Sequence, residues 1–374
     1  MADYNVLIVG AGVVGLALAA KISSCGYSVL VVEKHKSFGN EISSRNSEVI
    51  HSGIYYEKDS LKANLCLSGN KLLYQWCNKY RVPFRKTGKF IIAVNDNEHE
   101  GIERLFRKGI ENGVEDLFIT DVDTVLKLNP GIVCSSALFS GNSGIVDSHK
   151  LMESFISVAK EHDSDIAYGH NVIKTELKDT AYQTHIECEG ETFSVSSDFF
   201  INSAGLGADT IANNSGIDID LHKYRIQYVK GSYFKIKSDL NNIVNNLIYP
   251  VPPVNFTGLG VHITIDMAGE LKLGPDVEYL DSNLQDYKVN ESLIHKFYDS
   301  ASMFIPKLKM SDLTPDQAGI RPKLQKKGEP VRDFEINEES NKGFPKMINL
   351  IGIESPGLTS CIAIADYVYD NFIK

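Results

Sequence analysis

The stretch YNVLIVGAGVVG at Tyr4–Gly15 decides the fold. Its first half is a short, largely apolar run, which is typical of a strand that is buried on both faces of a sheet. The glycines then match the pattern GxGxxG, and an apolar helical pattern continues from Val13 to about Cys25, where Gly26 ends it. A second apolar run, Ser28–Val32, leads into Glu33, which lies 23 residues after the first glycine. This order predicts a β-α-β unit that binds a dinucleotide.

Each residue of this motif has a physical role in holding a dinucleotide. Gly10 permits the tight turn, Gly12 lets the backbone approach a pyrophosphate, and Gly15 lets the helix pack closely on the strand. The positive end of the helix then faces the phosphates, and Glu33 accepts a hydrogen bond from a ribose hydroxyl. Because a carboxylate at this position would repel a 2′-phosphate, the sequence disfavours NADP. We therefore predict these four residues to be cofactor-binding.

The composition is that of an ordinary globular protein. The chain has 374 residues, enough for about two domains, with 43% hydrophobic and 23% charged residues. Its 38 basic and 48 acidic residues give a net charge of −10, and we expect no nucleic-acid partner because phosphate binding requires a basic face. No apolar run reaches the roughly 18 residues of a membrane span. Met1 leads directly into a strand, so we expect neither a transmembrane segment nor a signal peptide.

The six cysteines and ten histidines show no metal-ligand spacing. No two cysteines form a CxxC pair and no histidines form HExxH or HxH, so we predict no metal site. We interpret the cysteines as free thiols of a reducing compartment. The predicted location is the cytoplasm. Peripheral attachment to the inner membrane is left open, although the sequence contains no strongly amphipathic basic helix.

Several further segments have helical or strand patterns. Ser60 is a predicted helix cap, and an apolar stripe follows it over Leu61–Tyr80. Residues 95–128 predict two helices with polar faces, which end before Pro130. Another helix is expected after Gly144–Asp147. Strands are expected over residues 90–94, 171–177, 183–188, 198–203, 224–236, 247–264 and 347–351.

Two more glycine-containing turns follow predicted strands. Ala204–Gly207 comes after a strand and predicts a second close approach of the backbone to a ligand. Gly352–Thr359 opens the last helix, whose free N–H groups would form a positive end. The chain thus weaves between two domains. We expect a discontinuous nucleotide-binding domain of residues 1–83, 144–219 and 316–374, and a substrate-binding domain of residues 84–143 and 220–315.

This arrangement of three turns resembles the D-amino-acid oxidase and glycine oxidase superfamily of FAD enzymes. Closer motifs are similar to those of L-2-hydroxyglutarate dehydrogenases, and the similarity covers nearly the whole chain. They are NSEVIHSGIYY at Asn46–Tyr56 and shorter matches at Ser60–Ala63, Gly144–Asp147, Ile248–Pro252, Leu259–His262, Gly274–Pro275 and Ala318–Arg321. The resemblance implies an α/β fold, with a Rossmann-like FAD-binding domain joined to a β-rich substrate-binding domain of the α+β type.

Two positions depart from this pattern. Glu48 stands where the dehydrogenases usually have a glycine, and Lys230 stands where an arginine is expected. A segment of glycerol-3-phosphate dehydrogenases also resembles Ser44–Tyr55. The substrate is therefore open, and one alternative is a sister flavoenzyme that oxidises an amino acid or glycerol 3-phosphate. Another alternative is a regulator that binds FAD or NAD without catalysis.

The resemblance implies that the chain oxidises a 2-hydroxy acid, with L-2-hydroxyglutarate as the first hypothesis. Hydride would leave the carbon that carries the hydroxyl group and reach flavin N5. The base that takes the hydroxyl proton should have a pKa near neutral, which favours His51 or His262. Arg321 is expected to grip the substrate carboxylate through two hydrogen bonds. In a diacid substrate, Lys230 would meet the second carboxylate.

The remaining predicted site residues also follow from the resemblance. Tyr249 and Tyr55 are expected to offer hydroxyl groups to the substrate. The turn before the last helix is expected to direct its N–H groups at the flavin N1–C2=O edge, where reduced flavin is negative. Further predicted FAD contacts are Lys34, Ser44, Arg45, Asn46, Ser52, Val172, Ala204, Gly205, Gly352, Gly357, Leu358 and Thr359. The expected partner is a small carboxylate substrate, and the electron acceptor, which is oxygen, a quinone or a carrier protein, is left open.

Overall fold

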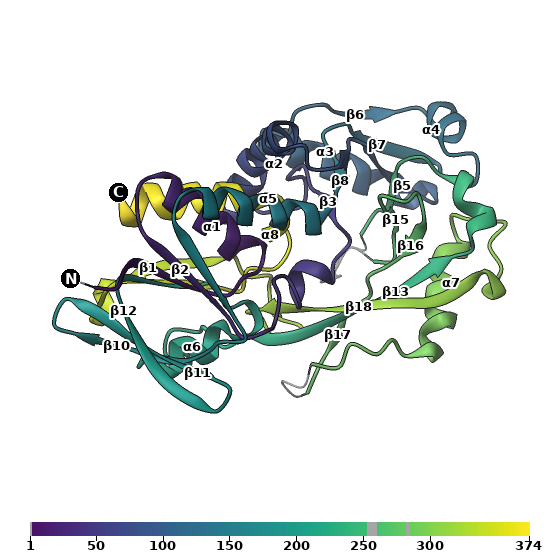
Figure 1. Cartoon of the computed structure of the whole chain (residues 1–374). Coiled ribbons are helices and arrows are strands. Elements are labelled where there is room, and N and C mark those ends of the chain that lie inside the picture. Colours follow the sequence, from purple (N-terminus) through teal and green to yellow (C-terminus); the bar gives the residue numbers. More distant parts are fainter. Residues whose placement is uncertain (1, 253–259, 282–284) are drawn as a thin grey trace.

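Two large β-sheets organise the chain, and they lie on opposite sides of the molecule (Figure 1). The computed structural model describes residues 2–252, 260–281 and 285–374. Within these residues, eight strands form the first sheet, nine form the second, and three short strands form a small third sheet. Both chain termini lie beside the first sheet.

The first sheet grows from the glycine-rich stretch at the N-terminus. Strand β1 (Tyr4–Val9) pairs in parallel with β2 (Val29–Glu33) on one side and with β12 (Glu191–Asn202) on the other. Strand β9 (Ser164–Tyr168) continues the parallel set beyond β2, and β20 (Phe344–Ile351) pairs in parallel with the end of β12. Antiparallel strands complete the sheet, namely β10 (Asn171–Lys178), β11 (Ala181–Cys188) and β19 (Glu335–Glu339). The parallel strands form the Rossmann-like part of the fold.

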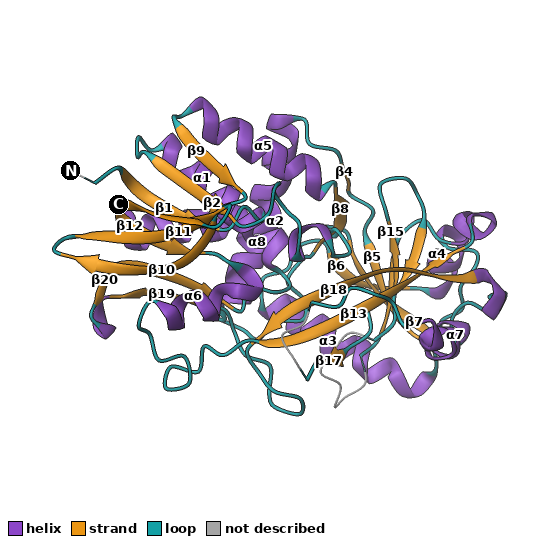
Figure 2. Cartoon of the chain, turned by 60° about the horizontal axis from the view of Figure 1, so that its bottom comes forward, coloured by secondary structure: helices purple, strands orange, loops and turns teal. Residues whose placement is uncertain are grey.

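Helices cover both faces of the first sheet (Figure 2). One face carries α1 (Val13–Ser24), α5 (Ser148–Glu161) and α8 (Gly357–Val368). Helix α2 (Leu61–Tyr80) packs against α8. The opposite face carries the short helix α6 (Ala208–Asn214). The central strands β1 and β2 are therefore largely buried on both faces.

Burial on both faces explains the apolar run of β1. Val6 and Ile8 pack toward α1, α5 and α8, whereas Leu7 and Val9 pack toward α6. These four side chains are at most 6% exposed. A strand with one face in water would alternate polar and apolar residues, so the pattern and the observed burial agree.

The second sheet contains a pair of long antiparallel strands, β13 (Gln227–Ile236) and β18 (Leu313–Lys323). Because the whole of β18 pairs with β13, it crosses the predicted domain boundary at residue 316. The other strands are β5 (Lys89–Ala93), β6 (Leu117–Thr120), β7 (Ser136–Ser140), β14 (Leu247–Pro250), β15 (Ile263–Ile265), β16 (Leu271–Leu273) and β17 (Glu278–Tyr279). Helices α3 (His99–Glu111) and α7 (Ile294–Ser302) pack against this sheet, and β3 (Val49–Ile50), β4 (Phe84–Arg85) and β8 (Gly144–Val146) form the small third sheet.

The predicted elements are largely present, with one correction. Residues 95–128 contain α3 and α4 (Val122–Leu128) as expected, but β6 lies between them. This four-residue edge strand exposes both Phe118 and Ile119, so it is too short and too irregular to show an alternating pattern. Residues 253–259, in the middle of the strands expected over 247–264, lie outside the described residues.

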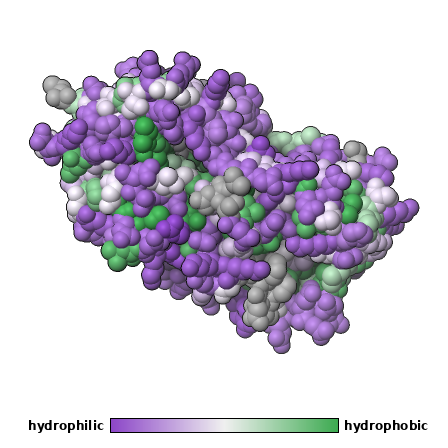
Figure 3. Space-filling model, turned by 90° about the horizontal axis from the view of Figure 1, so that it is seen from below, coloured by the Kyte–Doolittle hydropathy of each residue, from purple (hydrophilic) through white to green (hydrophobic). Residues whose placement is uncertain are grey.

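The surface of the molecule is mainly polar. Hydrophilic side chains dominate the face seen from below, and apolar side chains form small patches on it (Figure 3). No helix within the described ranges has both the length and the apolar character that crossing a bilayer requires.

Candidate functional site

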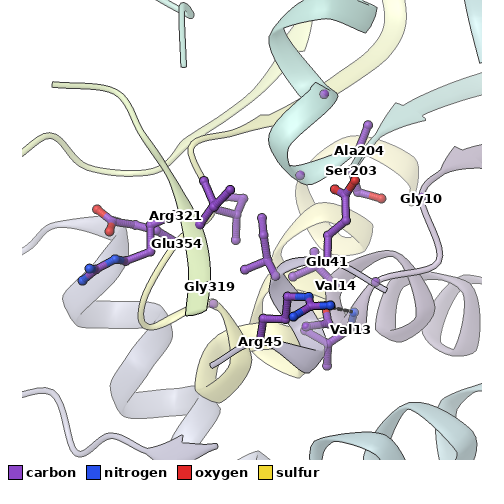
Figure 4. Close-up of a pocket in the computed structure, with 18 of the residues that line it drawn as sticks. Gly10, Val13, Val14, Glu41, Arg45, Ser203, Ala204, Gly319, Arg321 and Glu354 are labelled. Carbon is purple, nitrogen blue, oxygen red and sulfur yellow. Dashed lines mark hydrogen bonds between the residues drawn. The ribbon is translucent and has the colours of Figure 1, made fainter. Parts of the chain in front are cut away.

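A cavity of about 690 Å³ connects the glycine turn of the first sheet with the strands of the second sheet. Figure 4 shows part of its lining, with Gly10 and Ala204 on one side of the view and Arg321 on the other. Of the predicted catalytic and substrate residues, His51, His262, Arg321 and Tyr249 line it. Of the predicted cofactor residues, Gly10, Gly12, Gly15, Glu33, Lys34, Arg45, Asn46, Val172, Ala204, Gly205, Gly357 and Leu358 line it.

The glycine turn before α1 leaves no room for side chains. A Cβ atom at Gly15 would lie 2.0 Å from the Gly10 carbonyl oxygen, and one at Gly10 would lie 2.8 Å from the Ser203 carbonyl oxygen. Gly10 also has a φ of +100°, which only glycine adopts readily. The N-cap of α1 is Gly12, which has no side chain to cap the helix, and the Ser43 hydroxyl accepts a hydrogen bond from the Val13 N–H at 2.9 Å. The other N–H groups at this positive helix end remain available to an anionic ligand.

The carboxylate of Glu33 is held at the end of β2. Its Oε2 accepts a hydrogen bond from the Ala11 N–H at 2.8 Å, and its Oε1 accepts one from the His35 N–H at 2.9 Å. Each carboxylate oxygen keeps further acceptor capacity. Glu33 is thus positioned to accept a hydrogen bond from a ribose hydroxyl on the cavity side.

A second open helix end faces the cavity from the C-terminal part of the chain. Helix α8 has Pro356 as its N-cap and no side-chain cap, and Ser355, Gly357 and Leu358 line the cavity beside it. The glycine turn with its open helix fits a pyrophosphate, Glu33 fits a ribose, and the open end of α8 fits the carbonyl edge of an isoalloxazine ring. The residues present therefore fit FAD.

The register of β14 and β15 brings two predicted residues together. Ile248 pairs with Ile263 in this antiparallel ladder, so Tyr249 stands directly opposite His262. Their rings stack with centroids 3.8 Å apart and planes 21° from parallel. Cross-strand neighbours on one face are within packing distance, and this pairing fixes the plane of the imidazole.

Two glycines make room for Arg321 and for the nearby nucleotide-binding loop. A Cβ atom at Gly231 on the paired strand β13 would lie 2.6 Å from Nη2 of Arg321. A Cβ at Gly319 would lie 2.0 Å from the Arg45 carbonyl oxygen. Nη2 of Arg321 donates to the Asp276 carbonyl oxygen at 2.5 Å. This bond anchors the guanidinium at the cavity wall.

The two cavity histidines are held neutral. Burial, together with the positive charges of Lys89 and Arg321, lowers the pKa of His262 to about 3, against a smaller opposing effect of the Gly260 carbonyl. The Nδ1 of His262 lies 3.0 Å from the Gly260 carbonyl oxygen, which can only accept a hydrogen bond, so Nδ1 carries the hydrogen and the free lone pair is on Nε2. Burial, then Lys89 and then His262 lower the pKa of His51 well below its ordinary value.

Comparison with known proteins shows the family of this chain. A family model described as "FAD dependent oxidoreductase" matches residues 5–371, almost the entire chain. The chain belongs to this family. The predicted cofactor, FAD, and the predicted enzyme class are thereby confirmed.

The relatives of this FAD-dependent oxidoreductase match it over most of their length. It is 35% identical to "L-2-hydroxyglutarate dehydrogenase, mitochondrial" of Arabidopsis thaliana, over 99% of this chain and 83% of the relative. It is 31% identical to "Glycerol 3-phosphate dehydrogenase" of Caloramator mitchellensis, over 98% and 73%. The FAD-bound, dithionite-reduced L-alpha-glycerophosphate oxidase from Mycoplasma pneumoniae superposes with a TM-score of 0.84 at 26% identity, over 97% and 93% of the two chains. The predicted D-amino-acid oxidase-like fold is confirmed.

Lys230 of the oxidoreductase does not reach the cavity. On β13 the cavity is lined by Tyr228, Gly231 and Tyr233, and Lys230 is not among the lining residues. The Nζ of Lys230 instead donates to the Lys288 carbonyl oxygen at 2.6 Å and pairs with Asp286 at 3.3 Å. The structure therefore gives the second carboxylate of a diacid no cation at Lys230.

Five other predicted residues of the oxidoreductase also lie off the cavity wall. Ser44 donates to the Gly39 carbonyl, and Ser52 pairs with Ser140 through their hydroxyls at 2.7 Å. Gly352 packs against Leu324 with a φ of +72°. The two others are Thr359, whose Oγ1 accepts from the His51 N–H at 3.0 Å, and Tyr55, whose ring lies 5.0 Å from the Nζ of Lys89. These five residues lie off the cavity wall.

The departure at Glu48 has a structural explanation. Glu48 has a φ of +55°, a left-handed conformation for which glycine is the usual residue. Its Oε1 accepts hydrogen bonds from the N–H and the hydroxyl of Ser148 at 3.0 and 2.6 Å. These two bonds at the start of α5 offset the backbone strain.

Several lining residues of the oxidoreductase escaped prediction. Ser203 is the last residue of the strand predicted over 198–203, and Tyr233 alternates with Gly231 on the strand predicted over 224–236, so both carried a sequence signal. Glu354 lies within the third glycine turn and was treated only as part of it. Lys89, which lies behind the wall and does not line the cavity, had no such signal, because a lysine at the start of a strand is ordinarily solvated.

Glu354 is the centre of a buried charge cluster beside the cavity. Its carboxylate pairs with Lys62 at 3.0 Å and with Lys323 at 2.8 Å, and the three side chains are at most 9% exposed. Burial opposes ionisation, but the two ammonium groups outweigh it and lower the pKa of Glu354 to about 2. The cluster ties α2 and β18 to the turn before α8.

We expect Glu354→Gln to lower the free energy of unfolding by about 3–5 kcal/mol at neutral pH, because two buried cations lose their counter-charge. The depressed pKa stabilises the fold above the ordinary value of 4.5 and ceases to do so as pH falls through about 2. Urea unfolding at several pH values measures both effects. Glu153→Gln, which removes an exposed carboxylate, should leave the midpoint nearly unchanged. If the free energies of unfolding of wild type and Glu354→Gln differed by the same amount at every pH down to about 2, the prediction would be contradicted.

Proposed function

We propose that this FAD-dependent oxidoreductase oxidises a small 2-hydroxy acid, and that its substrate is L-2-hydroxyglutarate, which becomes 2-oxoglutarate. The observation that carries this proposal is the presence of Arg321, His262 and His51 on the wall of one cavity with an FAD cradle. A guanidinium for a carboxylate and a neutral imidazole for a hydroxyl proton are the two groups that a 2-hydroxy acid requires. The similarity to the Arabidopsis L-2-hydroxyglutarate dehydrogenase supports the choice of acid.

Arg321 would bind the carboxylate next to the reacting carbon. Nη2 is held by backbone carbonyls of Asp276 and Lys230, at 2.5 and 3.5 Å. Within the described residues the remaining N–H groups of this guanidinium have no hydrogen-bond partner. A planar guanidinium that is fixed on one side can receive a carboxylate through parallel hydrogen bonds on the other. Arg321 would thereby orient the substrate.

His262 would take the proton of the substrate hydroxyl group on Nε2. Its Nδ1 is tied to the Gly260 carbonyl, and Tyr249 holds the plane of the ring. Flavin, when bound, supplies the hydride acceptor. The developing imidazolium would be formed close to the substrate carboxylate, whose negative charge compensates the cost of a buried cation.

A second candidate function is the oxidation of glycerol 3-phosphate. The relative named as a glycerol 3-phosphate dehydrogenase favours it, and Arg321 suits a phosphate as well as a carboxylate. Amino-acid oxidation and a non-catalytic role stay as alternatives from the sequence. We keep oxygen, a quinone or a carrier protein as proposed electron acceptors, and a cytoplasmic location with open membrane attachment as the proposed localisation.

The proposal predicts that L-2-hydroxyglutarate bleaches the flavin of the purified holoprotein under anaerobic conditions. Flavin absorbance is followed after mixing, with D-2-hydroxyglutarate, L-lactate, glycerol 3-phosphate and glycine as controls. In His262→Gln the rate of bleaching should fall by about 100-fold or more, because a general base typically contributes that much. An amine substrate would depend less on His262.

Three results would contradict the proposal. Bleaching by glycerol 3-phosphate or glycine alone would keep the flavoenzyme and replace the substrate. Bound flavin that none of these compounds reduces would favour the regulator. Equal bleaching rates in wild type and His262→Gln would remove His262 from the role of base.

A further inference from the structure

A buried lysine behind the cavity wall has no ionic partner among the residues that the structure describes. Lys89, the first residue of β5, is only 1% exposed. Among the described residues its Nζ makes no ion pair and no hydrogen bond, and no carboxylate contributes to its titration. The ammonium instead lies over two aromatic rings, 5.0 Å from the centroid of Tyr55 and 4.7 Å from that of Tyr249. Ring faces attract a cation, but they do not neutralise it.

The two tyrosines that hold Lys89 have unsatisfied hydroxyls of their own. Oη of Tyr55 and Oη of Tyr249 are buried, and neither has a hydrogen-bond partner in the described residues. Tyr249 is 0% exposed and lines the cavity. The buried Nδ1 of His51, also a lining residue, is likewise without a partner. Native proteins leave few buried polar groups unpaired, so this cluster indicates that the groups meet a ligand.

The charge around the cluster specifies an anion. Lys89 faces Cys66 from α2, and it lies close enough to His51 and His262 to lower the pKa of both, after the larger effect of burial. Burial in turn lowers the pKa of Lys89 to about 8, so most of the ammonium is charged at neutral pH. The carboxylate of Glu354 on the cavity wall is already neutralised by its two lysines. A counter-charge for Lys89 must therefore enter through the cavity.

We propose that Lys89, Tyr55 and Tyr249 form a second anion subsite, which receives the terminal acidic group of a dianionic substrate. Tyr249 contacts this group from the cavity wall. Lys89 is not itself a lining residue, and it acts as a positioning residue that supplies positive charge through the ring of Tyr249. Lys89 thus takes the role that the sequence assigned to Lys230. The inference rests on the proposed function in one respect, since Arg321 holds the other acidic group.

The test compares a dianion and a monoanion of similar length as inhibitors. Dissociation constants of glutarate and butyrate are obtained from the absorbance change of the oxidised holoprotein. Lys89→Met should weaken glutarate binding about tenfold or more and change butyrate binding by less than about threefold, because only glutarate has a second charge to lose. Lys89→Arg, which keeps the charge, should restore most of the preference for glutarate.

Two further variants keep the test independent of folding. Tyr249→Phe removes one hydroxyl and little volume, and should lower the preference for glutarate about threefold or more. Lys230→Met is the matched control, since its Nζ is bound to Lys288 and Asp286 away from the cavity, and it should leave the preference unchanged.

The outcomes separate this inference from the proposed function. Equal losses for glutarate and butyrate in Lys89→Met, or loss of the preference in Lys230→Met instead, would overturn the subsite. L-2-hydroxyglutarate could fail to bleach the flavin while glycerol 3-phosphate binds. In that case the affinity for glycerol 3-phosphate relative to that for glycerol, measured in wild type and in Lys89→Met, decides whether the subsite exists. A fall of about tenfold in this affinity ratio in Lys89→Met would establish the subsite as one for a phosphate and reject the proposed substrate. An unchanged ratio would reject both.

Discussion

A Gly15→Ala variant should be purified without FAD. The added methyl group would lie 2.0 Å from the Gly10 carbonyl oxygen and 2.8 Å from Oγ of Ser203. Relieving these two close contacts requires the start of α1 to move away from β1 and from the end of β12. Because pyrophosphate binding depends on the position of this helix end, we expect FAD affinity to fall by at least about 100-fold. The ratio of flavin to protein absorbance after purification, followed by FAD titration of the apoprotein, measures the loss.

A matched control separates this clash from the general effect of removing a glycine. Gly113 follows α3 with a φ of +81°, and a Cβ there would meet no atom within 4 Å. Gly113→Ala should cost roughly 1–2 kcal/mol of stability through backbone strain alone and should keep its flavin. A yellow Gly15→Ala protein with wild-type FAD affinity would show that the turn before α1 is not where the cofactor is held.

Arg321→Met should lower kcat/KM for the proposed substrate by about 10³-fold. A carboxylate that enters a buried site and loses its guanidinium partner forfeits roughly 2–5 kcal/mol. Arg321→Lys should recover part of the loss, because it restores the charge but not the two parallel hydrogen bonds. Steady-state kinetics and the anaerobic bleaching rate report the effect, and FAD content should stay close to that of the wild type.

The control for Arg321 is an arginine of the same chain outside the cavity. Arg225 forms an exposed ion pair with Asp220, and Arg225→Met should leave kcat/KM unchanged. Arg321 also holds the Asp276 carbonyl, so the unfolding midpoint must be measured beside the kinetics. If stability and activity fell together in Arg321→Met while Arg321→Lys restored both fully, the guanidinium would be a structural tie and not the substrate anchor.

The nucleotide-binding half of the site could be predicted because its geometry is local. A buried strand, a glycine turn and a helix follow one another within Tyr4–Ser24, and backbone stereochemistry allows few arrangements of such a sequence. Glu33 is the last residue of β2, the next strand of the same unit, so the same pattern predicted its position. Tertiary packing had little to add to these positions.

The substrate half could be predicted only as a set of residues. Tyr249 and His262 were both candidates, but their stacking depends on the register of β14 with β15, which the sequence does not reveal. Lys230 and Gly231 are neighbours in the chain and lie on opposite faces of β13. A shift of one residue exchanges the faces of a strand, so finding the strand did not reveal that Lys230 bonds to Lys288 and Asp286.

The position of β20 and α8 has a consequence for protein synthesis. Strand β20 lies between β12 and β19, and the start of α8 forms part of the cavity wall, so the FAD cradle includes residues near Gly10 and residues near Gly357. A nascent chain must therefore be synthesised through the start of α8 before it can capture FAD. Until then the apolar faces of β1 and α1 that pack against α8 in the folded protein stay exposed to solvent. Because exposed apolar surface promotes aggregation, chaperones would be most needed during this interval.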